Sequence, residues 1–243
     1  MEIREVEEAQ EKLWCNLCEN NVLDWEYIGE DREIFHYKKI IGASRRKGGC
    51  PVCGSSDRIR YVYYIMRKYT NLLDGFAHDV LHFAPEEILS SKVRALCGNN
   101  YISADLMSAN ADVAADITNL QFADEQFEYI ICNHVMEHIA DEEKAFSELR
   151  RCLKAGGILI LTVPICWEQK TFEASDVKTE EDRIKNYGQA DHVRLYGNDI
   201  VSRVEKFGFS VNLYVCNQVV DRNRIRKFGY IERDSVLLCK RAE

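Results

Sequence analysis

The chain has 243 residues, of which 46% are hydrophobic and 30% charged, and its formal net charge is −8. These values are ordinary for a globular protein and exclude a disordered or fibrous chain. The apolar runs have the length of strands, and none approaches the roughly 20 residues that span a bilayer. The acidic N-terminus lacks the apolar core of a secretory signal. We therefore expect a cytoplasmic protein without a membrane span.

Two CxxC pairs mark the N-terminal part of the chain, separated by the 31 residues of segment 19–49. In a reducing compartment such pairs favour metal binding over disulfides. Four thiolates form the closed tetrahedral shell that structural zinc prefers. Two chance pairs and a redox CxxC are the alternatives, and a redox role is disfavoured because neither pair lies in a βαβ unit. We predict a zinc ribbon over residues 1–56, whose ligands are Cys15, Cys18, Cys50 and Cys53.

The segment between the pairs is predicted to form a hairpin, with strands at residues 27–29 and 33–37. His36 is an alternative metal ligand in place of a cysteine, although a position on a hairpin face is favoured. The run Arg45-Arg46-Lys47 that follows is either a basic patch for nucleic acid or a solvated loop. Proteins that bind nucleic acid usually present a basic face, because neutralising phosphates supplies much of the affinity. The acidic balance of the chain therefore argues against a nucleic-acid partner.

From residue 57 onward an amphipathic helix leads into alternating strands and helices. This alternation predicts an α/β fold, a Rossmann-like, doubly wound and mostly parallel sheet over residues 57–243. Glycine is expected to end the second of the main helices at Ala155-Gly156-Gly157. The polar stretch 167–189 suits either a lid or a surface insert. The predicted strands are 79–83, 101–104, 112–115, 127–132, 157–163, 209–215 and 235–239, and the predicted helices are 86–96, 142–153 and 199–207.

Polar side chains follow these strands at the edge where a doubly wound sheet binds its ligand. The first loop, from His82 to Glu86, lacks the glycines that a nicotinamide or flavin enzyme needs beside a pyrophosphate. Asp105 lies at the offset of a carboxylate that accepts hydrogen bonds from ribose hydroxyls, although a helix N-cap would have the same position. Asp116 and Ile117 suit the amino group and the ring of an adenine.

Together these segments resemble class I S-adenosylmethionine-dependent methyltransferases of the type 11 group. The first loop, the paired CxxC knuckles and the segment DHVRLYG at 191–197 are most similar to bacterial members encoded among genes for surface glycans. The resemblance covers nearly the whole chain. Its other motifs are Asp105, residues 116–122, residues 127–131, NHVMEHI at 133–139 and LRRCLKAGG at 149–157.

The resemblance implies S-adenosylmethionine as the cofactor and a hydroxyl of a sugar or surface-glycan precursor as the acceptor. In the first loop, His82, Ala84 and Glu86 replace the acidic residue and the glycines usual in this family, which leaves a catalytically silent relative as an alternative. The residues expected at the cofactor are His82, Phe83, Ala84, Pro85, Asp105, Leu106, Asp116, Ile117, Asn133 and His134.

Methyl transfer to a hydroxyl is helped by a general base. His134 and His192 are the candidates, and a purely structural histidine is the alternative for each. The cluster of Asp191, His192, Arg194 and Tyr196 is expected at the acceptor site, where Asp191 orients the imidazole and Arg194 holds an anionic group. Two other functions stay open: an RNA methyltransferase that holds RNA with its zinc ribbon, and a non-catalytic binding module of the same fold.

Overall fold

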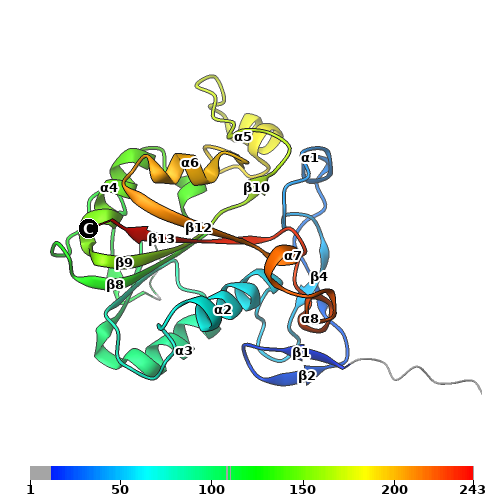
Figure 1. The fold of residues 1–243 in the computed structure, drawn as a ribbon. Helices are drawn as coiled ribbons and strands as arrows, with labels where there is room; N and C mark the ends of the chain where they lie inside the picture. Colours follow the sequence, from blue (N-terminus) through cyan, green and yellow to red (C-terminus); the bar gives the residue numbers. More distant parts are fainter. Residues whose placement is uncertain (1–11, 108, 110, 243) are drawn as a thin grey trace, which may run out of the picture.

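The computed structural model describes residues 12–107, 109 and 111–242. At its centre lies a seven-stranded sheet with the strand order β12-β13-β9-β8-β5-β6-β7 (Figure 1). Six of these strands are parallel, and β13 runs antiparallel to both of its neighbours. The predicted mostly parallel α/β sheet is confirmed. Its strands are β5 (Val80–Phe83), β6 (Tyr101–Asp105), β7 (Val113–Ala114), β8 (Phe127–Asn133), β9 (Leu153–Thr162), β12 (Phe209–Val215) and β13 (Ser235–Arg241).

The strand order reverses in the middle of this sheet. β5 pairs with β6 on one side and with β8 on the other, so the chain winds outward in both directions from this point. In open α/β sheets a crevice forms outside the carboxyl ends of the strands at such a switch point. The fold therefore places a binding crevice beyond Phe83, Asp105 and Asn133, the last residues of β5, β6 and β8.

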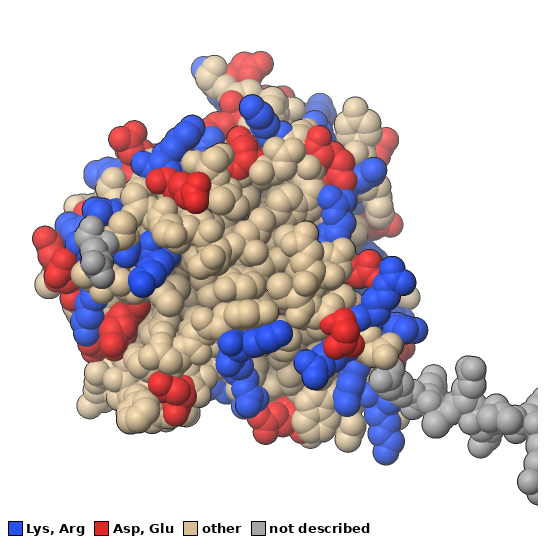
Figure 2. Space-filling view, viewed as in Figure 1, with Lys and Arg blue, Asp and Glu red and all other residues tan. Residues whose placement is uncertain are grey.

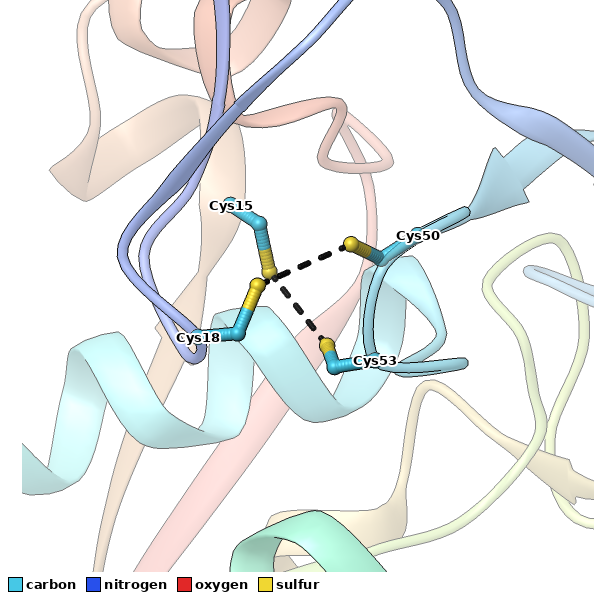
Figure 3. Close-up of side chains that lie close together, drawn as sticks. All are labelled: Cys15, Cys18, Cys50 and Cys53. Atoms are coloured by element: carbon cyan, nitrogen blue, oxygen red, sulfur yellow. Dashed lines mark hydrogen bonds between the residues drawn. The ribbon is translucent and has the colours of Figure 1, made fainter.

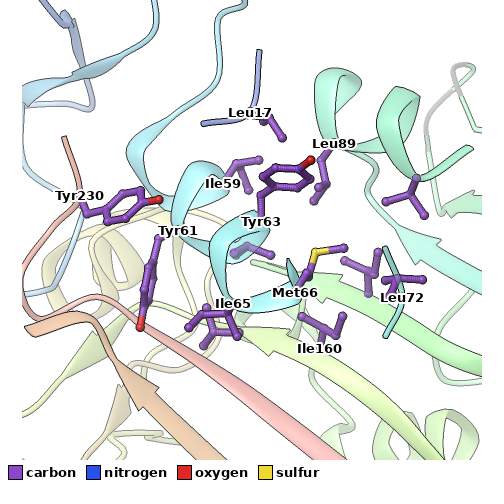
Figure 4. Packing of buried hydrophobic residues seen from close by; sticks show 14 of the residues in the cluster. Leu17, Ile59, Tyr61, Tyr63, Ile65, Met66, Leu72, Leu89, Ile160 and Tyr230 are labelled. Carbon is purple, nitrogen blue, oxygen red and sulfur yellow. The ribbon is translucent and has the colours of Figure 1, made fainter. Parts of the chain in front are cut away.

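Helices cover both faces of the sheet (Figure 1). On one face lie α2 (Asp57–Tyr69) and α3 (Glu87–Cys97), and on the other lie α4 (Glu142–Cys152) and α6 (Ile200–Glu205). Successive side chains of a strand point to opposite faces, so Val80 joins the core of α2 and Leu81 joins the core of α4. Figure 4 shows Met66 of α2 near Ile160 of the sheet. Burial on both faces explains why the strands are continuous apolar runs.

The N-terminal module (residues 12–56) consists of two small antiparallel hairpins and one short helix. β1 (Leu13–Cys15) pairs with β2 (Asn20–Val22), and β3 (Glu26–Ile28) pairs with β4 (Arg46–Gly49). The strand predicted at 33–37 is wrong, because these residues form α1 (Glu33–Tyr37). A segment of five residues is too short for its periodicity to distinguish a helix from a strand, and in the structure Phe35 packs against residues far along the chain. His36 consequently lies exposed on α1, 2.8 Å from Asp31.

The predicted glycine cap of α4 is also wrong. The helix ends at Cys152 and β9 begins directly with Leu153, so Gly156 lies inside the strand. Gly156 has the expected positive φ of 73°, but it serves an irregular start of β9. Leu153 is fully buried and is paired with Phe127 of β8. Because Leu153 pairs with β8, the helix ends and the strand begins before Gly156.

The polar stretch 167–189 contains a helix, α5 (Glu180–Tyr187), which lies beside α1 (Figure 1). Just outside the stretch, β10 (Ile165–Cys166) pairs in parallel with β11 (Tyr196–Gly197). The stretch is thus packed against the N-terminal module instead of standing free in solvent. A small core shared by the two segments contains Phe35, Ile40, Cys166, Tyr187 and Leu195.

The remaining described elements are short. Two single turns, η1 (Gly98–Asn100) and η2 (Met136–His138), follow α3 and β8, while α7 (Cys216–Val219) and α8 (Arg222–Phe228) lie between β12 and β13. Within the described residues, no helix is both long enough and apolar enough to cross a membrane.

Arg60 of α2 joins the N-terminal module to the rest of the chain. Its side chain is fully buried, and it donates hydrogen bonds to the carbonyls of Gly48, Ser55, Phe228 and Gly229 at 2.7–3.2 Å. The guanidinium carbon also lies 3.9 Å from the centre of the Trp25 ring, a cation–π contact. One side chain thereby satisfies carbonyls from β4, from the loop after it and from the end of α8.

We expect Arg60→Met to destabilise the protein by about 3–4 kcal/mol. The substitution fills the space but leaves four carbonyls, two of them in buried hydrogen bonds, without their charged donor, and the loss at a buried carbonyl costs roughly 1–3 kcal/mol. Urea unfolding followed by circular dichroism measures the change. Arg67→Met, at an exposed position of the same helix, is the control and should cost less than about 0.5 kcal/mol. Equal stability of the two variants would contradict the joining role of Arg60.

Candidate functional site

The four paired cysteines converge in the N-terminal module (Figure 3). The Sγ atoms of Cys15 and Cys53 are 3.8 Å apart, those of Cys18 and Cys50 are also 3.8 Å apart, and all four lie within 4.8 Å of one another. A tetrahedral shell with zinc–sulfur bonds of about 2.3 Å has sulfur–sulfur edges of about 3.8 Å, whereas a disulfide bond is about 2.05 Å long. The spacing therefore fits a single zinc ion better than two disulfides.

Both CxxC segments close with the same turn. The amide of Glu19 donates to the Cys15 carbonyl at 2.8 Å, and the amide of Gly54 donates to the Cys50 carbonyl at 2.9 Å. The donor residue has a positive φ in each turn, 58° at Glu19 and 70° at Gly54. Ser55 adds a hydroxyl 3.2 Å from the sulfur of Cys53. Hydrogen bonds of this kind orient the ligands around a metal ion.

The switch-point crevice is a cavity of about 560 Å³ at the carboxyl ends of the central strands. Two residues at its edge have the strained positive φ that is common at functional sites, Ala84 directly after β5 (46°) and His134 directly after β8 (53°). The backbone therefore turns sharply directly after β5 and β8, the two strands that flank the switch point. The crevice is lined by Phe83, Ala84, Asp105, Leu106, Met107, Ala115, Asp116, Ile117, His134, Val135, His138, Ile139 and Asp191.

Two carboxylates and an exposed apolar pair stand on one side of this crevice. Asp105 accepts a hydrogen bond from the amide of Met107 at 2.8 Å. Asp116 accepts from the amide and the hydroxyl of Thr118, and these bonds, the amide first, hold the pKa of Asp116 below its usual range. Beside them Leu106 and Met107 are 62% and 89% exposed. Apolar side chains at the rim of a cavity suit a ligand ring that covers them.

Three residues expected at the cofactor do not line the crevice: His82, Pro85 and Asn133. His82 is fully buried, and its two ring nitrogens lie 2.8 Å from the Tyr101 hydroxyl and 3.0 Å from the Glu86 carboxylate. Asn133 is also buried and accepts a hydrogen bond from the Thr162 hydroxyl. These side chains hold the strand ends together. The other seven expected residues, Phe83, Ala84, Asp105, Leu106, Asp116, Ile117 and His134, line the crevice.

His134 lies between two charged groups. Its Nδ1 is 3.2 Å from Oε1 of Glu137, a carboxylate that is only 2% exposed. Burial raises the pKa of Glu137, but the hydrogen bond from His134 and the charges of His134 and His138 outweigh it, so the pKa is lowered. On the other side, the guanidinium of Arg58 lies 3.2 Å from Nε2 and 3.4 Å from Nδ1. Because its distances to the two ring nitrogens are nearly equal, the guanidinium lies against the His134 ring.

The module cavity, a second hollow of about 280 Å³, lies between the N-terminal module, the start of α2 and the segment after α5. Arg58 connects it to the crevice, because this side chain lines the module cavity and contacts His134 of the crevice. His192 also lines the module cavity, whereas its neighbour Asp191 lines the crevice. Its lining consists of Ile28, Gly29, Glu30, Phe35, Ile40, Gly42, Ala43, Arg46, Ser56, Arg58, Pro164, Tyr187, Gln189 and His192.

The cluster expected to form one acceptor site is thus divided. Arg194 lines neither the crevice nor the module cavity, because its buried guanidinium donates to the carbonyls of Met136 and Ala140 and pairs with Glu173 at 2.7 Å. Tyr196 is fully buried and donates to a carboxylate of α4 at 2.6 Å. These two side chains anchor the loop after β8 and are not carried into the acceptor site proposed below.

Several residues around the two cavities were not found by sequence reasoning. Arg58 is in the first turn of α2, while Tyr187 and Gln189 follow a stretch that was predicted only as polar. No local pattern marks these positions, since they meet only through the packing of α1 against α5. Arg46 belonged to the suspected basic patch, but it forms a bidentate ion pair with Asp57.

Residues 76–161 match the family model described as a methyltransferase domain. Among solved structures, an S-adenosylmethionine-dependent methyltransferase from Mesorhizobium loti aligns with a TM-score of 0.52 and 11% identity, over 77% of this chain and 99% of that chain. Phosphoethanolamine N-methyltransferase 2 from Haemonchus contortus, in complex with S-adenosyl-L-methionine, gives a TM-score of 0.51 and 13% identity, over 76% of this chain and 53% of that chain. No curated protein matches the chain in sequence.

The chain has a methyltransferase fold. The methyltransferase-domain match begins before β5 and ends within β9, so it contains every strand end that borders the crevice. The N-terminal module and the segment after β9, which together enclose the module cavity, lie outside the match. The chain spans about half the length of the Haemonchus enzyme. The part shared with methyltransferases is therefore the part that would hold the cofactor.

Proposed function

We propose that this protein is an S-adenosylmethionine-dependent methyltransferase that methylates a hydroxyl of a sugar or surface-glycan precursor. The observation that carries the proposal is the crevice at the switch point of a methyltransferase domain, with Asp105 and Asp116 on its wall. S-adenosylmethionine would bind there and supply an electrophilic methyl group on a sulfonium sulfur. The protein itself would bind, align and exclude water.

The crevice has the donors and surfaces that this cofactor needs. The Asp105 carboxylate, at the end of β6, is positioned to accept hydrogen bonds from ribose hydroxyls. Asp116, held ionised by Thr118, suits the adenine amino group, and Ile117 with Leu106 provides apolar contact for the ring. Ala84, a small residue with a positive φ of 46° in the lining of the crevice, is proposed to lie beside the methionine part. A glycine-rich loop is unnecessary because the cofactor has no pyrophosphate.

The module cavity is the proposed acceptor site. Its lining combines the aromatic rings of Phe35 and Tyr187 with polar groups such as Gln189 and Glu30, a mixture suited to the apolar faces and hydroxyls of a sugar. Arg58 is proposed to hold the anionic group of the acceptor, the role that the sequence analysis gave to Arg194. Within the described residues its guanidinium contacts His134 and forms no salt bridge, so it is available for an anionic group on the acceptor.

His134 is the proposed general base. It stands on the crevice wall directly after β8, and Arg58 links it to the module cavity. Glu137 orients its ring through Nδ1, so Nε2, which also faces Arg58 at 3.2 Å, is the nitrogen proposed to take the hydroxyl proton. His192 lines the module cavity and is close to the acceptor, but its buried ring has a different proposed role, argued in the next subsection.

The cysteine cluster is proposed to bind one structural zinc ion, in a zinc ribbon over residues 1–56 that precedes the methyltransferase domain at 57–243. Four thiolates leave no open position for a reactant, so the ion would hold the module against α2 and shape the module cavity. All ten cysteines are unpaired, which fits the reducing cytoplasm that we propose as the location.

An RNA acceptor is the second candidate, and the charge distribution does not favour it. Figure 2 shows Lys and Arg interspersed with Asp and Glu around the rim of the visible face, with few charges over its centre. In the suspected basic patch, Arg46 pairs with Asp57 and Lys47 pairs with Asp24. Charges that are already paired add little to phosphate binding.

Replacing Asp105 with alanine tests the cofactor site. Because hydrogen bonds to a charged group contribute about 1.5–3 kcal/mol, we expect the dissociation constant for S-adenosylmethionine to rise roughly 10- to 100-fold. Isothermal titration calorimetry measures it. Asp176→Ala, at an exposed position away from the crevice, should bind like the wild type.

The same titration separates the enzyme from a non-catalytic module. Wild-type protein that does not bind S-adenosylmethionine would overturn the proposed function, and unchanged affinity in a folded Asp105→Ala variant would overturn the role of this residue alone.

A further inference from the structure

Among the residues that the structure describes, two buried polar atoms next to the crevice have no hydrogen-bond partner: Oε2 of Glu137 and Nδ1 of His192. The two residues are only 2% and 4% exposed. A buried polar group without a partner costs about 1–3 kcal/mol, so each such group calls for an explanation. Both atoms belong to residues of one cluster, and a common explanation is therefore required.

The third member of the cluster is His138. One ligand atom from each of Glu137, His138 and His192 lies within 4.8 Å of the other two. Because the two partnerless atoms make no hydrogen bond, a direct contact between them does not explain the cluster. Separations of about 3–4.5 Å are what three ligands show around one ion with bonds of about 2.1 Å. The upper limit of 4.8 Å on the separations of these ligand atoms is compatible with one cation that bridges them.

We propose that Glu137, His138 and His192 bind a divalent transition-metal cation of the zinc class. Two imidazoles and one carboxylate form the ligand set of many catalytic zinc and iron(II) sites, which keep at least one open position. Magnesium and calcium prefer sites built from oxygen ligands. The site is distinct from the cysteine cluster, which is in the N-terminal module and offers only sulfur.

The groups around the cluster support this assignment. Nδ1 of His138 is 3.2 Å from the Asp191 carboxylate, which leaves Nε2 for the cation. A histidine ligand that donates its other nitrogen to a carboxylate is the usual arrangement at protein metal sites. Oε1 of Glu137 is engaged by His134, which leaves Oε2 for the cation. The rings of His138 and His192 meet edge to face with centres 4.7 Å apart. Each ligand is thus already oriented.

The position of the cluster gives the cation a role that rests on the proposed function. His138 lines the crevice and His192 lines the module cavity, so the cation would lie where cofactor and acceptor meet. It would hold the acceptor hydroxyl and make it more acidic. The hydroxyl proton passes to His134, the oxygen bonds to the methyl carbon, and the carbon–sulfur bond breaks. The products are a methyl ether, S-adenosylhomocysteine and one proton.

Zinc stoichiometry of the full-length protein tests the site. Protein dialysed against micromolar Zn²⁺ and then analysed for metal should contain two zinc ions per chain, one in each cluster. In Glu137→Gln and His192→Asn the second ion should bind at least about 100-fold more weakly, because a ligand is lost, while the cysteine-bound ion stays. His36→Ala, which removes an exposed histidine of α1, is the matched control and should retain both ions.

A single zinc ion per chain at every Zn²⁺ concentration would overturn the proposal, as would a second ion whose affinity is the same in Glu137→Gln. If a variant does not fold, anomalous scattering at the zinc edge from wild-type crystals places the ion directly. A second peak away from Glu137 and His192 also counts against the site. Neither measurement involves S-adenosylmethionine. Failure of the cation site and failure of cofactor binding are therefore separate outcomes.

Discussion

Cys15→Ser is expected to lose the zinc ion and to lower the melting temperature by roughly 10 °C or more. Structural zinc contributes on the order of 10 kcal/mol in small modules, and folding and binding are coupled there. Cys15 is fully buried beside Cys53, so the hydroxyl cannot be repositioned to replace the thiolate. The loss extends beyond the module, because Cys15, Leu17 and Trp25 belong to the same core as α2.

Metal analysis combined with thermal unfolding by circular dichroism measures both effects. Cys97→Ser is a matched control, since Cys97 is equally buried in the same core but lies in α3, outside the CxxC pairs. It should keep its zinc and lose only about 1–2 kcal/mol of stability. A Cys15→Ser protein with wild-type zinc content and melting temperature would show that the cluster is not a metal site.

His134→Ala is expected to reduce kcat about 10²- to 10⁴-fold, the usual contribution of a general base. The acceptor would still bind in the module cavity, so its KM should change much less than kcat. Transfer of a labelled methyl group from S-adenosylmethionine to a panel of sugars first identifies the acceptor, and steady-state kinetics then measures the variant.

Two further variants make this result specific. His134→Asn keeps a hydrogen-bonding group toward Glu137 but cannot take the proton, so it should be as slow as His134→Ala. His36→Ala, on the exposed side of α1, should turn over like the wild type. If both His134 variants have a kcat near that of the wild type, His134 is not the general base and has a purely structural role.

The elements predicted best are those whose signal is local. Strand β12 was predicted at its observed bounds, and β5, β6, β8 and α4 within two residues at each end, because apolar runs and helical periodicity reflect burial directly. β9 was placed four residues too late, because pairing with β8 overrides the glycines at 156–157. Residues 33–37 were assigned the wrong type, because a segment of only five residues, EIFHY, fits helix and strand equally well.

The residues of the candidate site show the same difference between local sequence signals and tertiary contacts. Positions at or just beyond strand ends, such as Asp105, Asp116 and His134, were predicted from the sequence and line the crevice, because parallel strands bring their carboxyl ends to one edge of the sheet. The four cysteines proposed to bind zinc were predicted from CxxC spacing alone, and the structure brings their sulfurs together. Arg194 could not be judged in this way, because its burial depends on carbonyls of the loop after β8.

By itself, the sequence determined the order of the strands of the central sheet and of its main helices, the residues at the strand ends and the two cysteine pairs, since each depends on neighbours in the chain. The tertiary structure decided the second half of the site. Arg58, Tyr187 and His192 come from segments far apart in the chain and meet only where the N-terminal module packs on α5. The partnerless atoms of Glu137 and His192 likewise appear only after folding, because being without a partner is a property of three-dimensional surroundings and leaves no pattern in the chain.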